Sequence, residues 1–321
     1  DHKIDESTYE ILNHKWVYMY GDSTTRQVWA SYAAPFRENN FERNVKEWTR
    51  HYCNKQQPHR KKHIKDGHFD EEGWRGPCGV NEVTCHVSGY GENGLLTFDW
   101  KHFPYEDYDD YLFNENGPWR KGFPGEGIRR PDLLTIQMNM HSCWHAYNEG
   151  IYSQHLQQPN VTMIEQHKND IWKLMAAVRT AVDTRVNNDP KMNATTVIVL
   201  TSGFTGYGFS TTKTDACIQQ LNRVTTEAAN SYGFAVLDRG EIERRMMYKS
   251  LYADNPVFPN EMHLIQPAQN LISTLLLQLY RCLHASGLSR SEFDQEKSKY
   301  PLEKKTAFRN WRYGNALHTP Q

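Results

Sequence analysis

Six short segments of the chain have the composition of strands, and those from residue 132 onward are continuous apolar runs, which is typical of buried strands. The predicted strands cover residues 15–20, 82–88, 94–100, 132–138, 196–201 and 234–238. Helical periodicity is found over residues 24–34, 163–187, 213–231 and 264–284. Apolar strands that alternate with helices indicate βαβ units. The pattern therefore predicts an α/β fold, a three-layer α/β/α sandwich around a mostly parallel sheet.

The same pattern predicts a single domain over residues 1–287. It carries an insertion at about 37–75, which is charged, rich in histidine and weakly periodic. Residues 104–131 are acidic and aromatic with several Gly and Pro residues, which favours a long loop. Residues 288–321 are charged without a clear period and are expected to form a C-terminal extension.

Composition narrows the classes of function. The 321 residues carry a formal net charge of −1, which argues against general nucleic-acid binding. No segment approaches the roughly 20 apolar residues of a membrane-spanning helix. The first residues do not look like a signal peptide, so any targeting segment is expected to lie outside the sequence. Aromatic residues make up 12% of the chain, which suits carbohydrate binding, although core and surface packing explains most of them.

Cysteines and sequons favour a secretory-pathway protein, in the Golgi lumen or outside the cell. The cysteines stand at positions 53, 78, 85, 143, 217 and 282, with no CxxC pair. Their even number permits three disulfides. Cys78 and Cys85 bracket a short loop, and Cys217 and Cys282 lie on predicted helices that they could join. Asn160 and Asn193 begin sequons and are candidate glycosylation sites. The alternative is a cytosolic enzyme with buried free thiols.

Polar residues follow the predicted strands at the sheet edge where doubly wound folds bind their ligands. The residues at these positions are Gly21-Asp22-Ser23, the Gly89–Gly94 region, Asn139 and His141, Ser202 and Gly203, and Asp238, with His263 before the last helix. This set contains a nucleophile, a base and oxyanion donors.

Ser23 stands at a strand-to-helix turn, where His263 could remove its proton. The N–H groups of Gly89 or Gly91 and the amide of Asn139 could stabilise an oxyanion. Each residue also has a simpler interpretation: Ser23 could be an N-cap, and His141 a packed histidine.

A metal site is a weaker interpretation. His59, His63 and His68, or the pair His141 and His145, have tolerable spacings, but no HExxH or Cys-His zinc pattern occurs. The His141 and His145 pair follows a predicted strand rather than a clear helix. No nucleotide-binding glycine motif is present. We therefore expect neither a metal nor a cofactor.

The run Gly21-Asp22-Ser23-Thr24-Thr25-Arg26-Gln27, with a histidine directly before the last apolar helix, resembles the first and last blocks of the SGNH/GDSL hydrolase superfamily. The GDST-x-RQ form and the segment DLLTIQMNMH are most similar to the PC-esterase branch. That branch includes the trichome-birefringence-like wall O-acetyltransferases and the neurexophilin-and-PC-esterase proteins. The resemblance covers about residues 16–284.

The resemblance implies an α/β/α fold with Ser23 as nucleophile and His263 as base. Asp22 and Arg26 belong to the first block, Gly89 or Gly91 to the second, and Asn139 with His141 to the third.

The family has an aspartate three residues before the histidine, and this chain has Asn260 there. Glu261, Asp254 or Asp238 could orient His263 instead. The site could also work as a Ser-His dyad without a carboxylate. A third explanation of the asparagine is a catalytically weakened domain that binds glycans instead.

The implied activity is a serine-dependent O-acyl, chiefly O-acetyl, esterase or acetyltransferase that acts on a glycan through an acyl-Ser23 intermediate. Its partners would be a carbohydrate or other ester and an acyl donor. Hydrolysis of a lipid or small ester is a further, weaker candidate activity. Residues 103–119, acidic and aromatic, could form the rim of a sugar site or an ordinary surface loop.

Overall fold

In the computed structural model the described residues are 11, 15–22, 24–25, 28–29, 32, 82–87, 94–100, 103–105, 109, 112–121, 130–147, 159–183, 194–203, 212–250 and 266–285. By its contacts the chain divides into one unit of residues 1–280 and a second unit of residues 281–321.

Within the described residues, one six-stranded sheet has the order β2-β3-β1-β4-β5-β6. The strands are β1 (Trp16–Gly21), β2 (Glu82–Val87), β3 (Gly94–Trp100), β4 (Leu133–Gln137), β5 (Thr196–Leu200) and β6 (Ala235–Leu237). All neighbouring pairs are parallel except β2 with β3. The six strands predicted from the apolar runs are thus confirmed, and so is the mostly parallel sheet.

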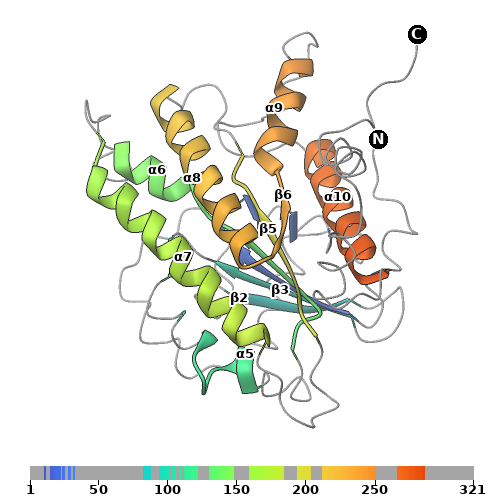
Figure 1. Cartoon of the computed structure of the whole chain (residues 1–321). Coiled ribbons are helices and arrows are strands. Elements are labelled where there is room, and N and C mark those ends of the chain that lie inside the picture. The colour runs from blue at the N-terminus through green and yellow to red at the C-terminus, as the bar shows by residue number, and fades with distance from the viewer. Residues whose placement is uncertain are drawn as a thin grey trace, which may run out of the picture. The chain divides into compact units, whose positions relative to one another are not determined.

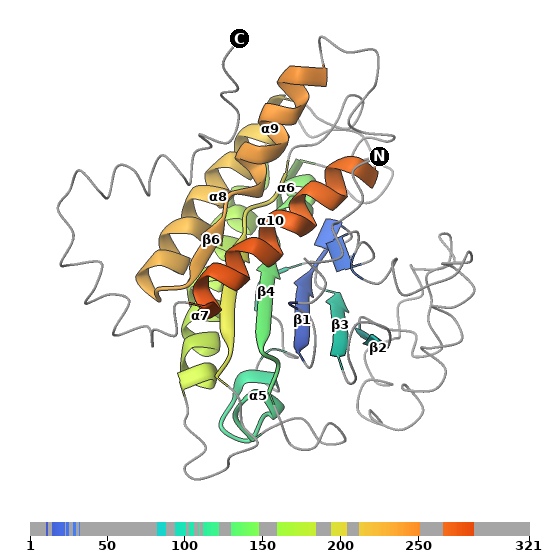
Figure 2. The same cartoon turned by 90° about the vertical axis from the view of Figure 1, so that its right-hand side faces the viewer.

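Helices cover both faces of this sheet. They are α5 (Pro118–Lys121), α6 (Met140–Tyr147), α7 (Val161–Asp183), α8 (Thr212–Ser231), α9 (Arg239–Ser250) and α10 (Gln266–Ala285). Figure 1 shows α7 and α8 on one side of the strands and α10 on the other, and Figure 2 shows α10 crossing in front of β4 and β1. Tyr32, in the helical segment after β1, donates a hydrogen bond from its hydroxyl to the Ser273 carbonyl of α10 at 2.7 Å. The predicted three-layer α/β/α sandwich is therefore confirmed.

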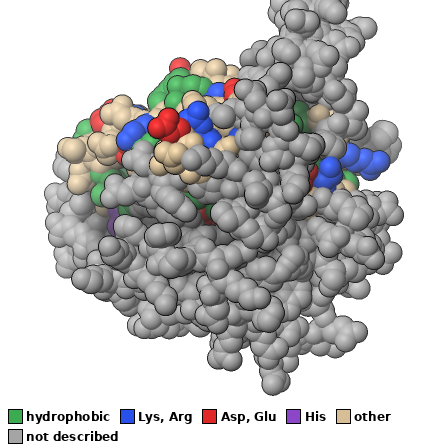
Figure 3. Space-filling model, turned by 90° about the horizontal axis from the view of Figure 1, so that it is seen from below, with side chains coloured by type: hydrophobic (Ala, Val, Ile, Leu, Met, Phe, Trp, Pro, Cys, Tyr) green, Lys and Arg blue, Asp and Glu red, His purple; other side chains and the backbone are tan. Residues whose placement is uncertain are grey.

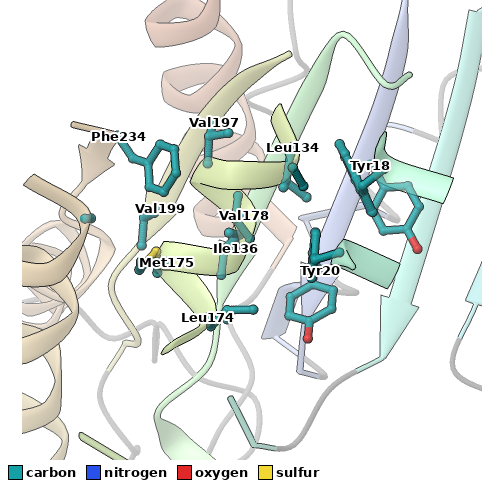
Figure 4. Packing of buried hydrophobic residues seen from close by; sticks show 14 of the residues in the cluster. Tyr18, Tyr20, Leu134, Ile136, Leu174, Met175, Val178, Val197, Val199 and Phe234 are labelled. Atoms are coloured by element: carbon teal, nitrogen blue, oxygen red, sulfur yellow. The ribbon is translucent and has the colours of Figure 1, made fainter. Parts of the chain in front are cut away.

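The main core lies between the sheet and α7. Figure 4 shows side chains of α7 directed at alternate residues of β1, β4 and β5. The labelled members are Tyr18, Tyr20, Leu134, Ile136, Leu174, Met175, Val178, Val197, Val199 and Phe234. Val17 and Met19, which alternation turns to the opposite face, are equally buried. Burial on both faces explains why the strand sequence is continuously apolar, since each such side chain contributes about 1.5–3 kcal/mol.

Some described residues of the acidic and aromatic stretch 104–131 belong to the core. Leu112, Phe113 and Trp119 pack in the main cluster, and Trp119 lies in the short helix α5. Asp109 is buried and accepts a hydrogen bond from the Tyr20 hydroxyl. These residues cannot line the rim of a sugar site, because their side chains lie against the sheet.

Two helices of the structure were not predicted from the sequence pattern. The first is α6, which begins three residues after β4 and carries the His141 and His145 pair, so the prediction that these histidines follow a strand without a helix was wrong. The second is α9, a charged helix that follows β6 directly.

The disulfide prediction for Cys217 was also wrong in its partner. Cys217 of α8 is bonded to Cys143 of α6, and Cys282 is an exposed free thiol. The bond lies in a small cluster that joins α6, α7 and α8 through Met140, Ala146, Ile164 and Leu221. Cys53, Cys78 and the side chain of Cys85 lie outside the described residues.

The described part of one molecular face carries Lys and Arg side chains next to Asp and Glu side chains, without a continuous patch of one sign (Figure 3). Ion pairs one helical turn apart, such as Arg179 with Asp183 on α7, have this character. In the part of the chain that the structure describes, no helix is both long and apolar enough to span a bilayer.

Candidate active site

The described residues next to the predicted nucleophile, Gly21, Asp22 and Thr24, lie at a topological switch point of the sheet. Numbered among themselves, the five parallel strands follow the spatial order 2-1-3-4-5, because β3 and β4 lie on opposite sides of β1. The chain therefore crosses to the other side of β1 between β3 and β4. Ligands of open α/β sheets bind beyond the carboxyl ends of the strands at such a point. Gly21 ends β1 at this edge and pairs with Gln137 at the end of β4, and Asp22 and Thr24 come after Gly21.

Asp22 and Thr24 are tied together on either side of residue 23. Asp22 Oδ1 accepts hydrogen bonds from the Thr24 backbone N–H at 2.9 Å and from the Thr24 hydroxyl at 2.6 Å. Both side chains are buried, with exposed fractions of 1% and 0%. A side-chain oxygen that binds the N–H two residues further on forms an Asx-type turn and fixes the direction of the backbone. The two neighbours of residue 23 are thus firmly held.

Gly21 brings this turn close to β4. A β-carbon at Gly21 would lie 2.3 Å from Thr25 Oγ1 and 2.4 Å from the Gln137 carbonyl oxygen. Both distances are far below van der Waals contact. Glycine is therefore required here for the close approach of two backbones.

A buried amide and a buried ion pair continue the hydrogen bonds of this turn. Gln137 Nε2 donates to the Thr24 hydroxyl and, at 3.4 Å, to Asp22 Oδ1. Gln137 Oε1 accepts a hydrogen bond from Arg239 Nη1 at 2.8 Å. Arg239 Nε in turn donates to Glu243, and each member of this ion pair is only 1% exposed. These hydrogen bonds link Asp22 and Thr24, which come after β1, to the end of β4 and the start of α9.

A second buried network surrounds Asn139. Its amide nitrogen donates to Asn222 Oδ1 at 2.8 Å and to Thr225 Oγ1 at 3.1 Å. Its oxygen faces His167 Nε2 at 2.9 Å, and His167 Nδ1 faces the Ser142 hydroxyl at 2.5 Å. Because both N–H bonds of Asn139 are used inside the protein, the structure gives this amide a role in joining β4 to α7 and α8. It leaves no N–H for the oxyanion that the sequence assigned to it.

Ser142, His167 and Asn139 have the connectivity of a nucleophile, a base and an orienting group. Their exposed fractions are 0%, 3% and 0%, so no substrate reaches the Ser142 hydroxyl in this structure. Burial lowers the pKa of His167 to about 3, so the ring is neutral at physiological pH. A neutral ring that donates through Nε2 to Asn139 accepts the Ser142 proton at Nδ1. In the described part of the chain, this buried network joins α6 and the end of β4 to α7.

The buried neutral His167 is expected to make the protein less stable as the pH falls below about 6.5. The unfolded chain takes up a proton at this histidine near pH 6.5, whereas the folded protein takes it up only near pH 3. Each pH unit between these values therefore lowers the free energy of unfolding by about 1.4 kcal/mol for this group. Urea unfolding of the wild type and of His167→Gln from pH 7 to pH 4 measures this, and the variant should show the shallower pH dependence. Equal pH dependence in the two proteins would contradict a neutral buried His167.

The other residues predicted for the site divide into described and undescribed ones. His141 is a half-buried residue of α6, and its ring centroid lies 6.4 Å from that of His145. Asp238, one candidate for orienting His263, caps α9 by accepting hydrogen bonds from the Thr201 hydroxyl and the Glu241 N–H. The predicted residues that lie outside the described ones are Ser23, Arg26, Gly89, Gly91, Asn193, Asp254, Asn260, Glu261 and His263.

Sequence reasoning missed Gln137, Arg239 and Glu243. A weak signal existed, because Gln137 is polar at the end of an otherwise buried strand and Arg239 and Glu243 are spaced one helical turn apart. Among the described residues, no group of three or more His, Cys, Asp or Glu side chains is arranged to hold a metal ion.

Comparison with known proteins gives no family. No family model and no curated protein matches the chain. Among solved structures, an alpha/beta hydrolase enzyme from the metagenome of Lake Arreo, Spain, has 14% identity, with 84% of this chain and 97% of that chain covered and a TM-score of 0.43. The native aryl esterase of M. smegmatis has 12% identity, with 84% and 99% covered and a TM-score of 0.41. An acetylxylan esterase from Geobacillus stearothermophilus has 11% identity, with 84% and 95% covered and a TM-score of 0.37. These values are too low to assign an activity.

Proposed function

We propose that this chain is a serine-dependent O-acyl esterase or acyltransferase of the SGNH type, with Ser23 as nucleophile. The observation that carries the proposal is the position of Gly21, Asp22 and Thr24, the described neighbours of Ser23 in the sequence, at the carboxyl end of β1 beside the switch point between β1 and β4. Two features support the proposal. Gly21 allows a close approach of two backbones that a side chain would block, and the turn formed by Asp22 and Thr24 is buried. A turn held in this way suits a hydroxyl that must be aimed at a substrate.

The chemistry follows from the residue types. Ser23 Oγ attacks the acyl carbon while His263 takes the serine proton, and the carbonyl oxygen becomes an oxyanion. His263 then returns the proton to the departing alcohol oxygen, which leaves an ester on Ser23. Attack by water regenerates the serine in an esterase, and attack by a sugar hydroxyl transfers the acyl group in a transferase. Exclusion of water from the site decides between the two.

Backbone donors fit the oxyanion better than Asn139. The N–H of Gly89 or Gly91 and the N–H of Ser23 itself are the proposed donors, because the Asn139 amide already donates to residues of α8. The group that orients His263 is also a proposal. Asn260 stands where the family has an aspartate, and Asp254 or Glu261 could supply the missing carboxylate. Asp238 is a weaker candidate because one of its oxygens already caps α9.

The proposed substrate is an O-acetylated glycan, as the similarity of GDST-x-RQ to the PC-esterase branch implies. Release of acetate from an acetylated oligosaccharide, measured beside release from an aryl acetate, tests this. The expected result is turnover of both esters that is lost in Ser23→Ala. Turnover that survives this substitution would contradict the proposal, and turnover of the aryl ester alone would exclude the glycan.

A second candidate function is glycan recognition without catalysis, and Asn260 is the feature that favours it. Loss of the triad carboxylate can lower kcat by about 10⁴-fold. Binding of an acetylated oligosaccharide by calorimetry, with no acetate released over hours, would support this function over the enzyme.

We further propose that the protein matures in the secretory pathway. Two observations support this: the Cys143–Cys217 disulfide, and an exposed sequon at Asn160. Asn160 Oδ1 accepts a hydrogen bond from the Met163 N–H and so caps α7. Protein secreted from eukaryotic cells is expected to lose mass on treatment with peptide N-glycosidase. Thr162→Ala should abolish a shift at Asn160 while keeping the cap, and an unmodified Asn160 would contradict the proposal.

A further inference from the structure

We infer that Arg239 is a positioning residue for the turn Asp22–Thr24, acting through Gln137. The inference rests on the proposed role of Ser23, which stands inside this turn. It assigns a function to the buried ion pair of Arg239 and Glu243 in α9, which lies more than 200 residues after this turn along the chain. The ion pair, the amide and the turn together are called the buried relay below, defined as Glu243, Arg239, Gln137, Thr24 and Asp22.

The relay begins at a fixed anchor. The Glu243 carboxylate packs against the segment that follows β5, where a β-carbon on Gly203 would lie 1.5 Å from Glu243 Oε2. Arg239 is held by this carboxylate through Nε and extends Nη1 to Gln137. An arginine whose Nε and Nη1 are both engaged has little rotational freedom. Arg239 is therefore held so that an Nη1 N–H points at the Gln137 side chain at the end of β4.

This anchor decides which way the Gln137 amide faces. Arginine can only donate, so the amide must turn its oxygen toward Arg239. Its N–H groups then point at the Thr24 hydroxyl and at Asp22 Oδ1. A reversed amide or an apolar residue at this position would leave buried donors or acceptors unpaired, which costs about 1–3 kcal/mol per group. The relay thus runs from a cation to a carboxylate with one consistent direction of donation.

A contribution to folding stability does not by itself explain why the buried relay contains an ion pair. A buried ion pair is often no more favourable than apolar residues of similar volume, although removing one partner is costly. The pair here lies at the carboxyl ends of the strands, at the edge where the ligand is expected, and two hydrogen bonds from the residues that flank Ser23. A nucleophile misplaced by about 1 Å can lose about 10²-fold in rate. Holding the turn to this precision is the role that the geometry supports.

Substitutions at Thr24 and Gln137 test the relay without unpairing the buried charges. Thr24→Val removes the hydroxyl at nearly constant volume, and Thr24→Ser keeps it. Gln137→Glu keeps an acceptor for Arg239 and removes the donors to the turn, but it also places a second buried carboxylate beside Asp22, so its free energy of unfolding is measured in parallel. Thr24→Val and Gln137→Glu should lower kcat by about 10- to 100-fold with KM changed less than about twofold. Thr24→Ser, which keeps the hydroxyl, should retain most of the wild-type kcat.

Arg239→Lys tests the anchor itself, because lysine keeps the charge and loses the planar fork. Its matched control is Arg179→Lys, which changes an exposed ion pair of the same spacing on α7. Arg239→Lys should lower kcat about tenfold and raise the rate of amide hydrogen exchange in a peptide that covers residues 21–29. The control should do neither.

Hydrogen exchange separates failure of the inference from failure of the proposed function. If Arg239→Lys and Gln137→Glu leave both kcat and exchange in residues 21–29 unchanged while Ser23→Ala is inactive, the inference is overturned and the function stands. If the wild type is inactive, the role of Arg239 in positioning a nucleophile is overturned together with the function. Loss of kcat with faster exchange in the turn, and rescue by Thr24→Ser, supports the inference.

Discussion

Ser23→Ala is expected to lower ester turnover by about 10³- to 10⁶-fold while the protein stays folded. Removal of the attacking oxygen leaves only binding and oxyanion stabilisation, which accounts for the residual rate of serine hydrolases that lack their nucleophile. The fold should persist because the contacts that hold this turn belong to Asp22, Thr24 and Gln137. Steady-state turnover of an aryl acetate, with circular dichroism of both proteins, is the measurement.

Ser142→Ala is the matched control, since Ser142 faces a histidine in the way a nucleophile does. Its hydroxyl is wholly buried, so turnover should change less than about threefold. Stability should fall by about 1–2 kcal/mol, because His167 loses a buried hydrogen-bond partner. Loss of turnover in Ser142→Ala, with turnover retained in Ser23→Ala, would identify Ser142 as the nucleophile and contradict the account.

Gly21→Ala is expected to destabilise the protein by about 3 kcal/mol and to lower turnover with it. The new methyl group would meet the Thr25 hydroxyl at 2.3 Å and the Gln137 carbonyl at 2.4 Å. The carbonyl belongs to the backbone of β4, which neighbouring strands hold on both sides, so it cannot move aside cheaply. The first turn of the following helix must therefore shift, and Asp22 and Thr24 shift with it. Thermal unfolding and turnover together measure the effect.

Gly240→Ala provides a milder comparison at the start of α9. Its β-carbon would lie 2.9 Å from the Ser202 carbonyl oxygen and 3.1 Å from Asn222 Nδ2. These contacts are tight but less severe, so a loss of about 1 kcal/mol is expected. A Gly21→Ala protein as stable as Gly240→Ala would mean that β1 and the helix after it are less closely packed than the structure has them.

The sheet could be predicted from sequence because burial on both faces leaves a direct trace. A parallel strand such as β1 must be apolar at every position, and the run Trp16–Tyr20 is. The long helices α7 and α8 carry a 3.6-residue period for the same reason. Helices α6 and α9 leave a weaker trace, because α6 has only eight residues and α9 is rich in charge.

Partners far apart in the chain could not be predicted. Cys217 pairs with Cys143 rather than Cys282, because packing of α6 against α8 decides which thiols meet. Asn139 was correctly placed after a strand, yet its hydrogen bonds depend on residues of α7 and α8. Gln137 was passed over because a polar residue at a strand end becomes informative only once Arg239 is seen beside it. Strand ends locate the site, and tertiary neighbours decide what each side chain does there.

The most direct test of the central claim is capture of the nucleophile by a fluorophosphonate probe, with the modified residue identified by peptide mass spectrometry. An activated serine reacts covalently with such a probe, whereas an ordinary helix-capping serine does not. The account predicts a single modification on Ser23 of the folded wild-type protein, lost in Ser23→Ala and retained in Ser142→Ala. No modification of the folded protein, or modification of another serine with Ser23 untouched, would contradict it.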